Sequence, residues 1–180
     1  MMNPYRFKNI LQFKTDGLIT YIMSDSFRIH YNHGLTKAIE LSEEKNVDLQ
    51  IILLRHPEEN QRNNNFFKKG ILGHEKFLSK FTNKVYYFEE LSDFFYKLLN
   101  RSSHIIKDRA YLREHLLLEK SIIDYSNKHS ISLTLVESNV MVPVLYASNK
   151  EEYSARTIRP KIIKNTRRRQ SKSFSWQGQL

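Results

Sequence analysis

The chain has 180 residues, of which 40% are hydrophobic and 27% are charged, and these values are typical of one globular domain with a core of its own. The absence of cysteine excludes disulfide bonds, a cysteine nucleophile and thiolate metal ligands. The formal net charge of +10 belongs to the end of the chain, because the part up to Glu152 holds all 19 acidic residues but only 21 of the 29 basic ones.

Short apolar segments, rich in β-branched and aromatic residues, alternate along the chain with segments of helical periodicity. In chain order the expected elements are a strand at 18–23, a helix at 34–45, a strand at 49–54, a helix at 66–81, a strand at 85–88, a helix at 91–99, a strand at 104–107, a helix at 111–127 and a strand at 133–136. Helical segments of this length supply the crossovers between parallel strands. The pattern therefore predicts an α/β fold, a five-stranded parallel Rossmann-like sheet with helices on both faces.

No apolar run approaches the roughly 18 residues that cross a bilayer. Polar and charged residues interrupt the first 14 positions, which therefore lack the apolar core of a signal peptide. We expect a cytoplasmic protein that has no membrane partner.

The usual chemical motifs of this fold class are missing. No glycine-rich phosphate loop follows the first strand, and no serine stands in a nucleophile elbow. His30 and His33 are three positions apart but have no third ligand nearby in the sequence, so we predict no metal site and assign no catalytic residue. In parallel sheets, ligands bind beyond the carboxyl ends of the strands. The expected cleft therefore lies around 23–28, 55–57, Glu89 and 108–111.

Four segments resemble one protein family. Residues 23–35 read MSDSFRIHYNHGL and resemble the M-x-x-S-x-R-x-x-Y-N-H-A-L segment of class II cyclobutane-pyrimidine-dimer photolyases, with Gly34 in place of the alanine. Residues 108–113 read DRAYLR and are similar to the D-R-x-Y-L-R that follows the fourth strand in the family. The loop PEEN at 57–60 and the stretch 136–162 are similar to the family as well, in the same order and spacing.

The resemblance implies the N-terminal α/β (antenna) domain of the photolyase and cryptochrome family. In that family the domain packs on a larger helical domain that holds FAD and the flipped thymine dimer; light excites the reduced flavin, an electron passes to the dimer, and the cyclobutane ring splits. Since the resemblance ends near Ile162, we expect a DNA-repair protein that is half of a split enzyme or a truncated remnant. The expected partner is then a helical polypeptide that carries the FAD.

The resemblance also suggests how the chain is divided. We expect an N-terminal extension at 1–15, the photolyase-like domain at 16–150, the start of an interdomain linker at 151–162 and a basic, disordered tail at 163–180. The alternative to the photolyase hypothesis is a free-standing α/β module that binds nucleic acid through this tail. The candidate contacts to DNA are Arg167, Arg168 and Arg169, and the competing interpretation is a solvated charge run.

The cleft and the linker supply the remaining site residues. No cofactor is expected to bind firmly to this chain, but the cleft is a candidate site for a deazaflavin-like antenna chromophore. The candidate cleft residues are Met23, Ser26, Arg28, Asn32, Asp108 and Arg109. Two alternatives stay open: Arg28 and Asn32 bond the turn after the strand, and Asp108 and Arg109 form a short-range ion pair that orders the loop. The seam toward the helical domain is expected at Tyr153, Arg156, Thr157 and Arg159.

Overall fold

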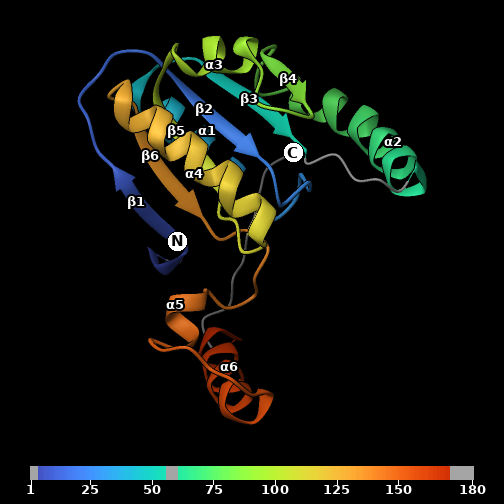
Figure 1. Cartoon of the computed structure of the whole chain (residues 1–180), viewed down its shortest axis with the longest axis vertical. Helices are drawn as coiled ribbons and strands as arrows, with labels where there is room; N and C mark the ends of the chain where they lie inside the picture. Colours follow the sequence, from blue (N-terminus) through green and yellow to red (C-terminus); the bar gives the residue numbers. More distant parts are fainter. Residues whose placement is uncertain (1–3, 56–60, 171–180) are drawn as a thin grey trace.

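The computed structural model describes residues 4–55 and 61–170. Its centre is one six-stranded sheet in the order β1-β6-β5-β2-β3-β4 (Figure 1). The strands are β1 (Phe7–Leu11), β2 (Leu18–Met23), β3 (Leu49–Leu54), β4 (Val85–Phe88), β5 (Ser102–Asp108) and β6 (Ser132–Val136). The helices are the 3-10 turn η1 (Pro4–Arg6) and α1 (His33–Lys45), α2 (Gln61–Leu78), α3 (Asp93–Leu99), α4 (Arg113–Lys128), α5 (Val144–Ala147) and α6 (Ala155–Gln170).

The five predicted parallel strands are confirmed, and β2 and β3 begin and end at the predicted residues. Both are buried along their whole length, as expected of strands covered on two faces. Successive side chains of β2 therefore enter different cores: Tyr21 lies on the α1 side and Ile22 on the side of α3 and α4.

Residues 7–11 lie in the predicted N-terminal extension, and in the structure they form a sixth strand of the sheet. Strand β1 pairs antiparallel with β6, with Phe7 opposite Val136. The apolar pattern did not predict β1, because the polar residues Lys8 and Asn9 interrupt it. A lysine on an edge strand commonly prevents pairing with a further strand.

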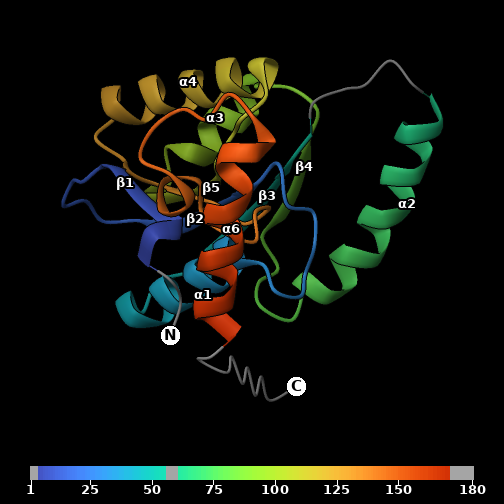
Figure 2. The same ribbon diagram turned by 90° about the horizontal axis from the view of Figure 1, so that it is seen from below.

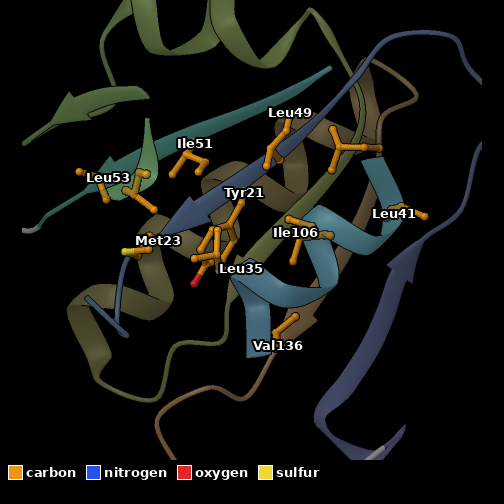
Figure 3. Close-up of a cluster of buried hydrophobic side chains, with 12 residues drawn as sticks. Tyr21, Met23, Leu35, Leu41, Leu49, Ile51, Leu53, Ile106 and Val136 are labelled. Carbon is orange, nitrogen blue, oxygen red and sulfur yellow. The ribbon is translucent and has the colours of Figure 1, made fainter. Parts of the chain in front are cut away.

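Two cores lie on opposite faces of the sheet. On one face α1 contributes Leu35, Ala38 and Leu41, and on the other α3 contributes Phe95 and Leu98. Figure 2 shows α1 and α4 on opposite sides of the strands, and Figure 3 shows side chains of β2, β3, β5 and α1 converging in the first core. The arrangement is the doubly wound one that the alternation of strands and helices predicts.

The chain leaves the sheet after β6 and forms an arm of α5 and α6, which lies beyond the carboxyl end of β6 in Figure 1. Residues 163–170 of the predicted tail continue α6. The arm is held by side-chain contacts between its parts, since Lys161 donates to Ser148 Oγ at 3.0 Å and Asn165 Nδ2 donates to the carbonyl oxygen of Tyr146 at 3.0 Å. The rest of the predicted tail, 171–180, lies outside the described residues.

In the part of the chain that the structure describes, no helix is both long enough and apolar enough to span a membrane.

Candidate functional site at the switch point of the sheet

The chain changes direction in the sheet between β2 and β5. After β2 it adds β3 and β4 on one side, and then crosses to place β5 and β6 on the other. The carboxyl ends of neighbouring strands that lead in opposite directions leave a crevice between their loops. Here the two loops begin at Ser24, after β2, and at Arg109, after β5.

Asp108, at the end of β5, is the centre of this region. Its Oδ2 accepts hydrogen bonds from the backbone N–H groups of Ser24, Asp25 and Ser26, at 3.0–3.2 Å, and its Oδ1 accepts one from the hydroxyl of Tyr21 at 2.9 Å. The carboxyl group is completely enclosed. One side chain of β5 therefore fixes the course of the loop after β2.

Asn32 holds the other end of the same loop. Its Nδ2 donates to the carbonyl oxygens of Ser26 and Arg28, each at 3.0 Å, and its Oδ1 accepts from the backbone N–H of Leu35 at 2.9 Å. The last contact makes Asn32 the N-cap of α1. These contacts show that Asn32 bonds the turn after the strand, which is one of the alternatives that the sequence left open.

Burial has the largest effect on the pKa of two enclosed groups, the Asp108 carboxyl and the Tyr21 hydroxyl. It raises the pKa of Asp108 above the usual range of a carboxyl group, against the opposing effect of the N–H donors from Ser26 and Asp25. Burial and the charge of Asp108 together raise the pKa of Tyr21 well above that of an ordinary phenol. Tyr21 therefore stays protonated and keeps a donor for the two oxygen acceptors that it faces, Asp108 Oδ1 and Asn32 Oδ1.

The structure does not pair Asp108 with Arg109, and this predicted ion pair is wrong. The Arg109 guanidinium lies 3.0 Å from Oε1 of Glu137, the residue after β6. Arg28 also reaches that loop, where it donates to the carbonyl oxygen of Ser138. Both arginines therefore join the loops at the carboxyl edge to one another.

Met23 and Ser26 have different surroundings. Met23 is fully buried and packs in the core on the α1 face. Ser26 is also buried, and its Oγ has no hydrogen-bond partner among the described residues.

Sequence reasoning missed two pairs of side chains that flank the crevice. His115 of α4 contacts Asp25 at 2.7 Å, and the fully buried Lys107 of β5 lies 3.6 Å from Glu119 and donates to Ser24 Oγ at 3.2 Å. A lysine at the end of an apolar strand was the available signal for the second pair. The first pair joins residues 90 positions apart, and no local pattern connects them.

These side chains surround a cavity of about 10 Å³, lined by Ser24, Asp25, Leu54, Lys107, His115 and Leu118. That volume suits one water molecule, whereas ligand pockets usually measure about 300–1,000 Å³. The described residues therefore do not fit a ring-sized chromophore at the switch point.

The predicted seam lies apart from the crevice. Tyr153 is 88% exposed, and Arg156, Thr157 and Arg159 are exposed on the first turns of α6. The nucleic-acid candidates Arg167, Arg168 and Arg169 form the end of the same helix, and their side chains lie outside the described part. The seam and the tail candidates thus share one helix, and the crevice residues are a separate group.

Among the described residues, no group of three or more histidine or acidic side chains is arranged to hold a metal ion. The ring of His30 packs edge-on against Phe77, with 5.4 Å between the ring centroids.

The fold defines a doubly wound α/β domain whose switch point lies between β2 and β5. The chain is 31% identical over 176 residues to the deoxyribodipyrimidine photo-lyase of Methanothermobacter thermautotrophicus, in a match that covers 93% of this chain and 39% of the relative. No family model matches the chain. The resemblance to photolyases is confirmed, and the chain, a photolyase-like α/β domain, spans about two fifths of the length of this relative.

Proposed function

We propose that the chain is the N-terminal domain of a class II photolyase and that it takes part in the light-driven repair of cyclobutane pyrimidine dimers together with a helical, FAD-binding polypeptide. One observation carries the proposal. The two segments that resemble class II photolyases, which follow β2 and β5, are joined at the switch point through Asp108. The similarity to the Methanothermobacter protein supports the photolyase part of the proposal, and the two segments support the class.

Splitting the dimer is the chemistry of the flavin when it is bound by the partner. The residues of this chain hold the carboxyl edge of the sheet in one shape, in which it can contact the helical polypeptide. The Glu137 carboxylate does this most directly. It accepts hydrogen bonds from the Tyr111 hydroxyl and, at 2.7 Å, from the backbone N–H of Val144, so the start of α4 and the start of α5 lie beside each other.

Large apolar side chains are exposed on both of these segments. Leu112 is 66% exposed, Met141 72% and Leu145 56%. Apolar groups gathered at one edge of a domain are typical of a surface that another protein covers. We assign this edge, with Tyr153, to the contact with the helical polypeptide.

The proposal is tested with the part of the Methanothermobacter relative that lies outside the match, produced as a separate polypeptide. Mixed with this chain, it should form a one-to-one complex by size-exclusion chromatography with light scattering. The double substitution Leu112→Glu and Leu145→Glu should weaken the complex at least 10-fold, because it places charges on the contact edge.

The matched control is Phe81→Glu. This residue is 43% exposed and precedes β4, at the amino ends of the parallel strands. This variant should bind as the unmodified chain does. If both polypeptides are folded by circular dichroism and form no complex, or if the control weakens binding as much as the double variant, the proposed contact is wrong.

The deazaflavin-like antenna chromophore stays a prediction. Binding at the switch point would require the contact between His115 and Asp25 to open, because the cavity that these residues line has room for only about one water molecule.

A further inference from the structure

Helix α6 has an unusual balance of charge. Its 16 residues include seven basic side chains and no acidic one. Lys161 is paired, since it contacts Glu152 and donates to Ser148 Oγ. Among the side chains that the structure describes, Arg156, Arg159 and Lys164 are exposed and form no ion pair.

The unpaired cations lie away from the side of α6 that contacts α5. Lys161 and Asn165, one turn apart, make the contacts to α5 and the segment after it. At 100° per residue, Arg156 and Arg159 lie on the opposite side of the helix and Lys164 lies on its flank. Arg159 and Lys164 line one open depression together with Pro160 and Ile163. From Arg156 to Lys164 this surface, which we call the α6 basic face, extends about 12 Å along the helix axis.

Such a helix is not stabilised by its own charges. Basic residues stand three positions apart, as in Arg156 with Arg159 and Lys161 with Lys164. Each such pair of like charges on neighbouring turns lowers the stability of a helix by about 0.2–0.5 kcal/mol. Apart from α5, no other element shares a substantial contact with α6 among the described residues. A polyanion along the exposed side would remove the repulsion and stabilise the helix.

We propose that the α6 basic face binds the phosphate backbone of nucleic acid. A duplex presents one negative charge per about 1.7 Å of its axis, so several phosphates lie within reach of a basic surface about 12 Å long. Contacts of this kind carry no base sequence, and the binding is therefore tolerant of sequence and weakened by salt. The inference does not depend on the proposed function, because it needs neither light nor a second polypeptide.

A membrane surface is the other polyanion to consider, and the helix is poorly suited to it. A helix that lies in a bilayer interface needs a broad apolar face. The apolar residues of α6 are Ala155, Ile158, Ile162 and Ile163, and they do not form one stripe, because Ile163 lies beside the cations.

The test is fluorescence anisotropy with a labelled 20-nucleotide strand and the corresponding duplex, over a series of salt concentrations. The triple variant Arg156→Gln, Arg159→Gln, Lys164→Gln should lose at least 10-fold in affinity. The slope of log Kd against log salt should fall by about 2–3, since each phosphate contact contributes roughly 0.7–0.9. The unmodified chain should also gain helical circular dichroism signal at 222 nm when DNA is added.

The matched control removes the same charge elsewhere, by Lys8→Gln, Lys120→Gln and Lys128→Gln, three exposed residues of β1 and α4. It should change the affinity less than 2-fold. Equal losses in the two triple variants would show a net-charge effect and overturn the proposal. So would an unmodified chain that binds neither form of DNA, or one that binds vesicles of anionic lipid through Arg156 and Arg159 but not DNA.

Discussion

Gly34 lies in the first turn of α1, where the helix backbone passes directly over the ring of Tyr21. A Cβ atom added at Gly34 would lie 2.6 Å from Cε2 and 2.9 Å from the hydroxyl oxygen of Tyr21. The ring has little freedom to move, because its hydroxyl is bound between Asp108 and Asn32. Glycine in place of the alanine of the similar family has the lower helix propensity. The structure gives it a packing role.

The substitution Gly34→Ala is therefore expected to destabilise the domain by about 1–3 kcal/mol, the usual cost of overpacking a core. Urea denaturation measures the change in the free energy of unfolding. The control is Gly73→Ala in α2, where an added Cβ meets no atom within 4 Å. That change should be neutral or stabilise the helix by up to about 1 kcal/mol. A stable Gly34→Ala variant would mean that α1 does not approach Tyr21 this closely.

His104 of β5 gives a prediction about pH. Burial, with smaller contributions from the charges of Lys45 and Lys37, lowers its pKa from 6.5 to about 4, while its Nε2 contacts Thr134 Oγ1 at 2.8 Å. Below pH 6.5 the unfolded chain takes up a proton that the folded chain refuses, so stability is lost as the pH falls from 6.5 toward 4.

The variant His104→Gln removes this titration while keeping a polar side chain next to Thr134. The free energy of unfolding of the unmodified chain should drop between pH 7 and pH 4.5 by more than that of the variant, with a difference of order 2 kcal/mol. Urea denaturation at the two pH values measures it. The same pH dependence in both proteins would show that His104 ionises freely in the folded state.

The turn before β1 holds the segment that follows β6, a role that the sequence did not predict. Arg6 is 4% exposed, and its guanidinium donates to the carbonyl oxygens of Glu137, Val140 and Met141, each at 2.7 Å. The start of the chain thus fixes the segment through which the chain leaves the sheet toward α5 and α6.

The substitution Arg6→Lys should lower the free energy of unfolding by about 1–3 kcal/mol, because an ammonium group cannot reproduce the planar fork that serves three carbonyls. Hydrogen exchange should also become faster in 137–147. The control is Arg101→Lys, an exposed residue just before β5, at the amino ends of the parallel strands, and this change should leave both measurements unchanged. Unchanged exchange in the Arg6 variant would mean that the exit segment is ordered without it.

The elements also show what sequence can and cannot predict. The parallel strands are short apolar runs, so their hydropathy alone located them, and the capping side chain Asn32 stood in a recognised motif. Strand β1 was hidden because Lys8 and Asn9 interrupt its apolar residues. The bonds of Arg6 to Glu137 and of His115 to Asp25 join positions 131 and 90 residues apart, and only the folded sheet brings them together.

The whole molecule consists of the sheet with its covering helices and the α5–α6 arm beyond one sheet edge (Figure 1). The crevice residues are bonded mainly to each other. The side chains of Leu112 and Leu145 are exposed on the carboxyl edge, and those of the α6 basic face are exposed on the arm. The domain thus orders its own loops internally, and our two proposals place its partners on the edge and on the arm.

The most direct test of the proposed function is a chimera in which this chain replaces the matched 39% of the Methanothermobacter photolyase. The measurement is the repair of cyclobutane pyrimidine dimers in an oligonucleotide, with and without light. We expect light-dependent repair by the chimera and none by the same protein with the matched part deleted. A chimera that is folded and retains flavin absorbance, yet repairs no more in light than in the dark, would contradict the assignment of this chain as a photolyase domain.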